Sequence, residues 1–160
     1  MGKFAIQIKA LLENCTNLRV SGADYIWSLK LRCTACGEST QKWHTVNPLD
    51  TFPMAGGKGK ANLIIKCKMC GRSNSVNMCV DFLTAYTSED SEQFKTIVVV
   101  EGRGIEPYEF LPNGEFVCEG TVTGTAFKGI ALDSGDWADF DDASNLPVGI
   151  YDCNTQIVPI

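Results

Sequence analysis

The sequence predicts an all-β protein, and three observations support this. Short runs rich in β-branched and aromatic residues recur along the chain, and Gly, Pro and Asn interrupt them. No segment keeps a capped helical period over as many as twelve residues. With 160 residues the chain can bury a core without cross-links, as one domain or two small ones.

The strand-like runs follow one another in both halves of the chain. Ile6 and Ile8 alternate on one face of the first run, and Trp27, Leu29 and Leu31 do so in the second. The predicted strands cover residues 4–10, 25–31, 63–65, 76–83, 96–100, 116–118 and the stretch 149–158. Two short segments, 88–93 and 136–143, are the best helical candidates.

Charge divides the chain near Ser88. Residues 1–88 hold 11 Lys+Arg and 5 Asp+Glu, whereas residues 89–160 hold 3 and 14. We therefore predict two domains, a zinc-binding β domain at 1–88 and an acidic, metal-free β domain at 89–160. One interpretation is that the second is a copy of the first, in which Gly120–Gly124 corresponds to Cys33–Gly37 and 150–155 to 65–70. Chance similarity between two β-rich halves is the alternative.

The use of cysteine depends on the compartment. The opening residues lack a secretory pattern, and no apolar run reaches the roughly 18 residues of a membrane helix. We expect a cytoplasmic protein, or one shared between cytoplasm and nucleus, with no membrane partner. Closely spaced cysteine pairs in a reducing compartment favour metal binding over disulfides.

Two such pairs carry the strongest chemical signal in the sequence. Cys33 and Cys36 precede Gly37, and Cys67 and Cys70 precede Gly71, with 30 residues between the pairs. Two residues between the cysteines allow a tight turn that aims both sulfurs at one ion, and four sulfurs form a closed tetrahedral site typical of structural Zn²⁺. Iron in a rubredoxin-like arrangement is the main competitor. Five basic residues near the pairs would offset the thiolate charge: Lys30, Arg32, Lys66, Lys68 and Arg72.

Other chemistries find less support. His44 is the only histidine, and its neighbours match no deaminase motif. The cysteine pairs lie between strand-like runs, unlike the helix start of a thioredoxin motif. No nucleophile–base pair is recognisable, so we predict no catalytic residues and no enzyme activity. The other four cysteines are interpreted as packing residues without close partners: Cys15, Cys79, Cys118 and Cys153.

The acidic segment 133–142 contains Trp137 and Phe140. It is either a solvated structural segment or a docking motif for a basic partner. A buried Trp137 would favour the structural interpretation, and this is what we expect.

These residues resemble a eukaryotic family, the CXXC motif-containing zinc-binding proteins. The similarity covers nearly the whole chain. It includes both cysteine pairs and the segments 2–5, 12–14, 17–18, 104–107, 124–127, 136–137 and 148–151. The resemblance implies two similar β-sandwich-like domains in tandem, with zinc only in the first. It implies no reaction.

The sequence thus favours a non-enzymatic protein with one structural zinc site, acting as a protein-interaction module of unknown process. The alternative is a zinc-ribbon-like nucleic-acid-binding module, because the first half is basic and offers Tyr25, Trp27 and Trp43 for stacking. A pI near 4.8 and the acidic second half disfavour it. The sequence indicates neither the partner's identity nor the oligomeric state.

Overall fold

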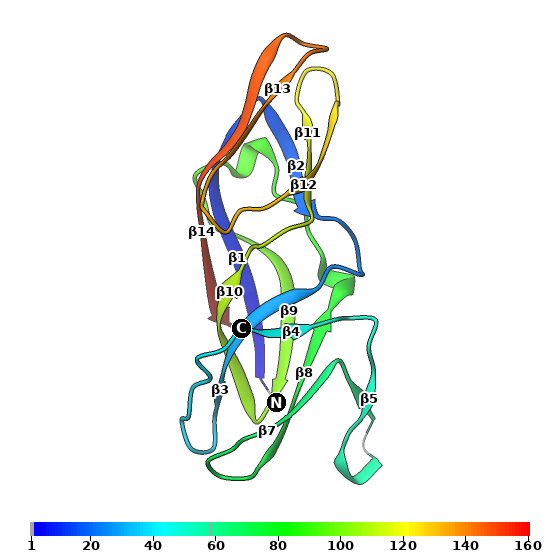
Figure 1. Ribbon diagram of the computed structural model, residues 1–160, viewed down its shortest axis with the longest axis vertical. Coiled ribbons are helices and arrows are strands. Elements are labelled where there is room, and N and C mark those ends of the chain that lie inside the picture. The colour runs from blue at the N-terminus through cyan, green and yellow to red at the C-terminus, as the bar shows by residue number, and fades with distance from the viewer. Residues whose placement is uncertain (1, 58) are drawn as a thin grey trace.

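Strands make up most of the structure, a computed structural model that describes residues 2–57 and 59–160 (Figure 1). The first series of strands comprises β1 (Gly2–Glu13), β2 (Cys15–Val20), β3 (Trp27–Cys33), β4 (His44–Val46), β5 (Phe52–Pro53), β6 (Lys60–Ala61), β7 (Leu63–Lys66) and β8 (Ser73–Cys79). The second comprises β9 (Lys95–Arg103), β10 (Ile105–Leu111), β11 (Phe116–Gly120), β12 (Ala126–Ile130), β13 (Trp137–Asp141) and β14 (Leu146–Pro159). Three 3-10 turns complete the described chain: η1 (Ala55–Gly57), η2 (Val80–Phe82) and η3 (Ser88–Asp90). The prediction of a mostly β protein is confirmed.

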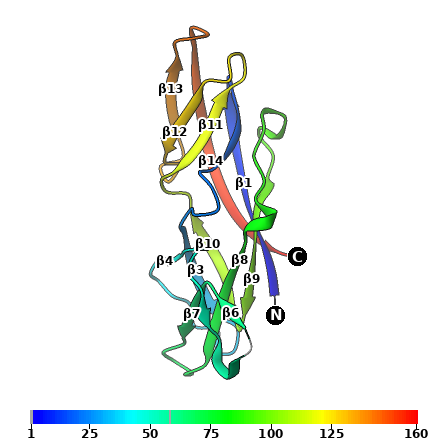
Figure 2. The ribbon, with the colours of Figure 1, turned by 90° about the vertical axis from the view of Figure 1, so that its right-hand side faces the viewer.

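A six-stranded antiparallel sheet forms the long axis of the molecule, in the order β13-β14-β1-β9-β8-β7 (Figures 1 and 2). Strand β1 lies near its centre and pairs with β14 along almost its whole length, from Phe4 opposite Pro159 to Glu13 opposite Gly149. Its predicted alternation is confirmed, because Ile6 and Ile8 are fully buried. No helix in the described ranges is long and apolar enough to cross a membrane.

Two three-stranded sheets cover this long sheet at its two ends. Figure 2 shows β10-β3-β4 beside β7, β8 and β9 at the lower end, and β12-β11-β2 beside β13, β14 and β1 at the upper end. Trp27, Leu29 and Leu31 of β3 are at most 1% exposed, as their alternation predicts. Phe116 of β11 is equally buried at the other end. Side chains from both ends join in one continuous core.

The boundary predicted at residue 88 does not separate two independently paired sheets. Corresponding strands of the two series have corresponding partners. However, the first two strands of each series pair with later strands of the other series. Strand β1 joins β14, β9 joins β8, β2 joins β11, and β10 joins β3. Each end of the molecule therefore contains strands from both predicted domains. Charge and composition describe the surface of a segment and carry no information about its pairing partner, which explains the difference. Whether the two series arose by duplication stays a prediction.

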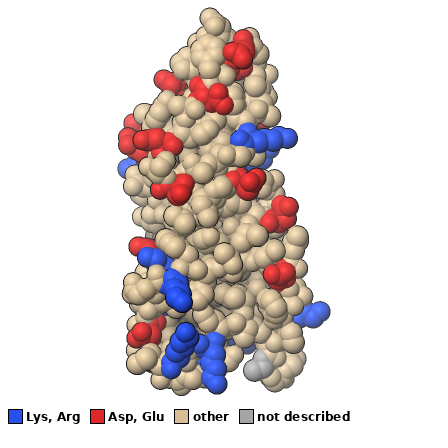
Figure 3. Space-filling model, viewed as in Figure 1, with Lys and Arg blue, Asp and Glu red and all other residues tan. Residues whose placement is uncertain are grey.

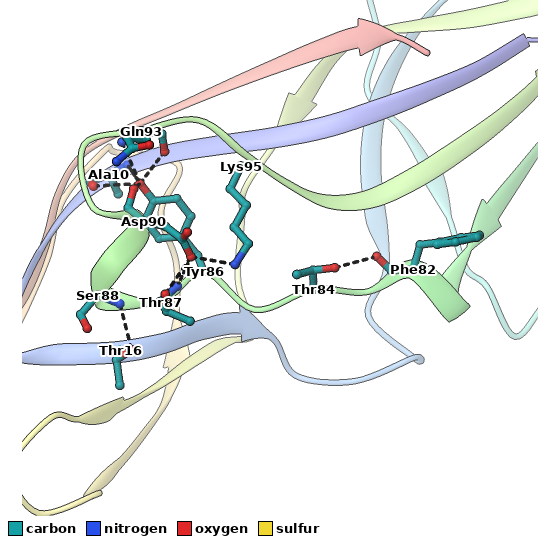
Figure 4. Close-up of polar contacts among 10 residues, drawn as sticks. All are labelled: Ala10, Thr16, Phe82, Thr84, Tyr86, Thr87, Ser88, Asp90, Gln93 and Lys95. Atoms are coloured by element: carbon teal, nitrogen blue, oxygen red, sulfur yellow. Dashed lines mark hydrogen bonds and ion pairs between the residues drawn. The ribbon is translucent and has the colours of Figure 1, made fainter.

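The connection between the two series is held by a buried tyrosine (Figure 4). Tyr86 is fully buried, and its hydroxyl lies 2.5 Å from the carbonyl of Asp90, 2.6 Å from that of Gln93 and 3.3 Å from that of Ala10 in β1. The carboxylate of Asp90 accepts bonds from the Thr87 amide and from Lys95 Nζ, at 2.8 and 2.7 Å. The chain thus crosses between the two series in a fixed path.

The two helical candidates had different outcomes. Residues 88–90 form a single 3-10 turn, η3. The prediction for 136–143 is wrong, because Trp137–Asp141 is strand β13, with Trp137 opposite Ile150 of β14. Pairing with a long neighbouring strand outweighs the weak local preference of this polar segment.

Candidate metal centre

Each cysteine pair occupies the same kind of turn at the end of a strand. Cys33 ends β3, its amide donates to the carbonyl of Glu38 at 2.9 Å, and the Gly37 amide donates back to its carbonyl at 2.8 Å. Cys67 follows β7 and repeats this pattern with Arg72 and Gly71, at 2.9 and 2.8 Å. The two glycines have φ values of 78° and 75°, a left-handed conformation that residues with a Cβ adopt only with strain.

The fold brings all four predicted ligands together. Their sulfur atoms lie within 4.8 Å of one another, with 3.8 Å between Cys33 and Cys70 and 3.6 Å between Cys36 and Cys67. A tetrahedral ion with metal–sulfur bonds of about 2.3 Å needs sulfur separations of about 3.8 Å. Disulfides would need about 2.05 Å. The donor set therefore fits a four-sulfur metal ion, and Zn²⁺ would complete its coordination here with no open position.

The turns prepare the sulfurs to bind metal. The Cys36 amide is the main cause that lowers the pKa of Cys33, to about 6, and the Cys70 amide lowers the pKa of Cys67. The Glu38 amide lowers the pKa of Cys36, but desolvation and the neighbouring thiols outweigh it and raise that pKa to about 12. Without a metal the crowded sulfurs therefore share their protons unequally. A bound zinc ion would keep all four deprotonated.

Two of the five basic residues predicted to crowd the site are paired elsewhere. Lys30 contacts Glu109 at 3.1 Å, and Arg32 contacts Glu106 at 3.1 Å, both on β10. The other three, Lys66, Lys68 and Arg72, form no ion pair with any acid in the described ranges. Figure 3 shows Lys and Arg gathered over the lower end of the molecule, where β3 and β7 end, and Asp and Glu over the upper part.

A pair of turns without cysteine occupies the corresponding place at the upper end. The Gly120 amide donates to the carbonyl of Thr125 and the Gly124 amide to that of Gly120, both at 2.9 Å, and Gly124 has a φ of 71°. This is the turn of the cysteine pairs, in the segment that the sequence matched to Cys33–Gly37. The facing turn runs from Asp141, the end of β13, to Leu146, the start of β14. The match of 150–155 to the second cysteine pair is wrong, because these residues continue β14.

Hydrogen bonds to one carboxylate join these two upper turns. Asp141 is 2% exposed and accepts from the hydroxyls of Thr123, Thr125 and Ser144 at 2.7, 2.9 and 2.9 Å. The bond from Thr123 is the largest of the causes that hold its pKa below the usual range. A Cβ at Gly120 would lie 2.8 Å from the Asp141 carboxylate, so a larger residue does not fit there without movement. The upper turns carry a carboxylate where the lower turns carry sulfur.

The remaining cysteines are not all isolated. Cys15 and Cys118 are buried on the paired strands β2 and β11, and Cys15 Sγ donates to the carbonyl of Gly149 at 3.3 Å. The Cys118 thiol is the main cause that lowers the pKa of Cys15, and the Cys15 thiol is the main cause that raises that of Cys118. Their proximity could not be predicted from the sequence, because 102 residues separate them. Cys79 and Cys153 are partly buried, and neither belongs to the four-cysteine group.

The aromatic residues of the acidic segment differ in exposure. Trp137, expected to be buried, is half-buried and packs edge-on against Phe127 with ring centres 5.6 Å apart. Phe140 is 46% exposed. The segment is thus a strand of the long sheet that one aromatic side chain anchors.

Comparisons with known proteins agree with the four-cysteine geometry. A family model described as CXXC motif containing zinc binding protein, eukaryotic, matches residues 5–158. The human protein of that name is 46% identical over 158 residues, which cover 99% of both chains. Its relative from Xenopus laevis is 47% identical over 152 residues, 95% of both chains. The crystal structure of C1orf123 is 45% identical and covers 99% of this chain and 100% of its own, with a TM-score of 0.95. The chain therefore belongs to the family of eukaryotic CXXC motif containing zinc binding proteins.

Proposed function

We propose that this chain is a non-enzymatic protein that holds one structural zinc ion and serves as a protein-interaction module, either in the cytoplasm alone or in both cytoplasm and nucleus. The observation that carries the zinc assignment is the cluster of four cysteine sulfurs within 4.8 Å of one another. The family name supports zinc over iron as the resident ion.

The position of the sulfurs supports a structural role. Cys33 ends a strand of a three-stranded sheet, and Cys67 follows the edge strand of the long sheet. An ion bound by both pairs would hold the two layers together at the lower end. Four protein sulfurs would leave no open position for a substrate, unlike the three-ligand sites of zinc enzymes.

The surroundings of His44 support the absence of catalysis. Partial burial lowers its pKa most, and the charges of Lys42 and Lys68 add to this. Within the described ranges no carboxylate forms a hydrogen bond or ion pair with its ring, as would be needed to orient it as a base. Hydroxyls and thiols line the same groove, but none of them in the described ranges forms a hydrogen bond with the imidazole.

Charge supports a protein partner over a nucleic acid. The whole chain carries a net charge of −5, and its acidic residues face outward over the upper part of the view in Figure 3. Tight binding to nucleic acid depends on neutralising several phosphates in a row, which an acidic surface opposes. The zinc-ribbon-like alternative would have to use the lower end alone.

Metal analysis tests the proposal. Purified chain grown with both zinc and iron should contain one zinc per chain by inductively coupled plasma mass spectrometry. Cys67→Ser should lose it, whereas Cys79→Ser should keep it, because Cys79 lies outside the cluster. Iron in place of zinc, or an unchanged metal content in Cys67→Ser, would overturn the assignment. The interaction role is tested by capturing proteins from a cell lysate with the zinc-loaded chain. The captured proteins are compared between untreated lysate and lysate treated with nuclease.

A further inference from the structure

A groove lies beside the cysteine cluster, between the two layers of the lower end. Its volume is about 440 Å³, and its walls are formed mainly by the segments 38–42 and 65–69, with His44 beside them. Ile65, Met69 and Ile105 give it apolar surface, and Cys33 and Cys67 border it. Of these, Met69 is 70% exposed and so offers most of its side chain to a partner.

Lysines surround this apolar surface. Lys42, Lys66 and Lys68 line the groove, and Glu38 is the one acid among its lining residues. The three lysines are exposed, and none of them is in an ion pair with an acid of the described chain. Together with Arg72 these lysines supply four positive charges. Against them stand the one negative charge of Glu38 and the two net negative charges of a zinc ion bound by four thiolates. The rim therefore stays positive, although the protein as a whole is acidic.

The groove also borders a free strand edge. Strand β7 is the last strand of the long sheet. Among the residues that the structure describes it pairs only with β8, from Leu63 opposite Val76 to Lys66 opposite Ser73. Its other edge offers backbone amides and carbonyls to a further strand. An extended peptide bound there would point alternate side chains into the groove and toward the rim.

We propose that this groove binds an extended segment of a partner protein in which carboxylate side chains alternate with aliphatic ones. The inference rests on the proposed interaction function and names the surface and the chemistry of the partner. The aliphatic side chains contact Ile65, Met69 and Ile105, and the carboxylates face Lys42 and Lys68. The backbone adds to the free edge of β7. A nucleic acid would use the lysines but would leave the apolar surface unused.

Fluorescence anisotropy with defined probes tests the inference. The probes are a short fluorescein-labelled peptide that alternates glutamate with leucine, the same peptide with lysine for glutamate, and a labelled oligothymidylate. We expect the acidic peptide alone to bind the zinc-loaded chain. Reversing two rim charges with Lys42→Glu and Lys68→Glu should weaken binding at least about tenfold. Lys128→Glu is the charge control, because this lysine is exposed and lies on β12 at the upper end.

A second pair of variants tests the apolar contact. Met69 and Val122 occupy the same position in the lower and upper turns and are 70% and 68% exposed. Met69→Ser should weaken peptide binding about fivefold or more, and Val122→Ser should leave it unchanged. The zinc content of every variant is measured, so that loss of the ion is not mistaken for loss of the groove.

The outcomes separate this inference from the proposed function. The groove inference fails if the acidic peptide does not bind. It also fails if the Lys128→Glu control and the Lys42→Glu/Lys68→Glu double variant bind the peptide equally well. Tighter binding of oligothymidylate through the same lysines would likewise overturn it. Zinc-loaded chain that captures lysate proteins regardless of the groove variants would keep the proposed function and overturn the groove. Chain without zinc would overturn the proposed function itself.

Discussion

Replacing Tyr86 by Phe should destabilise the whole protein without affecting its metal. The ring is fully buried, so Phe fits the same space, and only the hydroxyl is lost. This hydroxyl lies within bonding distance of three carbonyls and accepts from the amides of Ala10 and Gln93, both at 3.3 Å. The Gln93 amide also donates to the carbonyl of Asp90 at 2.9 Å and would keep that partner. The one proton of the hydroxyl serves one carbonyl at a time, so the substitution leaves one buried acceptor and one buried donor without their partner (Figure 4).

The expected loss is about 2 kcal/mol, since a buried group left unsatisfied costs about 1–3 kcal/mol. For a chain of this length that corresponds to a melting temperature lower by about 4–8 °C. Urea unfolding followed by tryptophan fluorescence measures the free energy, and mass spectrometry measures the zinc. The control is Tyr108→Phe, whose half-buried hydroxyl makes a single bond of 2.6 Å to the Thr40 carbonyl and should cost less than about 1 kcal/mol. A Tyr86→Phe protein as stable as wild type would refute the idea that this hydroxyl fixes the connection between the two series.

Three further predictions concern groups outside the groove. Asp141→Ala should lower the melting temperature and leave the zinc content unchanged. Asp142→Ala, at an exposed neighbouring residue, should change neither. Loss of zinc from Asp141→Ala would refute the separation of the two ends. Cys118→Ala should keep its metal and cost about 1 kcal/mol, the size of a small packing defect; a metal-free product would show that Cys118 takes part in the site. Burial raises the pKa of Asp90, but bonds from Lys95 and Thr87 outweigh this and hold that pKa below its usual 3.8. The stability that this carboxylate contributes is therefore present above about pH 4 and is lost as the pH falls through the lowered value, so Asp90→Asn should flatten acid unfolding; an unchanged acid profile would contradict this.

Much of the metal centre could be predicted because its information is local. A Cys-x-x-Cys turn followed by Gly encodes its own shape within five residues, and two such turns suffice for a tetrahedral site. The strand alternation of 25–31 was equally readable, since burial on one face leaves a period of two. These features depend on neighbours in the sequence.

Features that depend on distant segments could not be read in this way. The exchange of the first two strands between the series requires β1 to pair with β14, more than 130 residues away. The segment 136–143, predicted as a helix, is a strand for a more local reason, its hairpin pairing with β14, although β14 is itself held by the distant β1. The carboxylate cluster around Asp141 could not be predicted, because Thr and Ser have no fixed spacing that marks them as partners of one buried acid. A Gly four positions after Gly120, as in the cysteine turns, was its one sequence signal.

The two ends of the molecule join their layers by different chemistry, and this difference bears on function. At the upper end Asp141 links the turn after β11 to the turn after β13 through hydrogen bonds that only acid would remove. At the lower end the link between the turns after β3 and β7 depends on an ion that a chelator can take away. The groove lies at this lower end and is bordered by two of the ligands. Removing zinc at neutral pH should therefore abolish binding of the acidic peptide and raise hydrogen exchange in β3 and β7 before it does so in β11 and β13. Equal loss of protection at both ends on chelation would show that the metal supports the whole fold and does not act mainly on the groove.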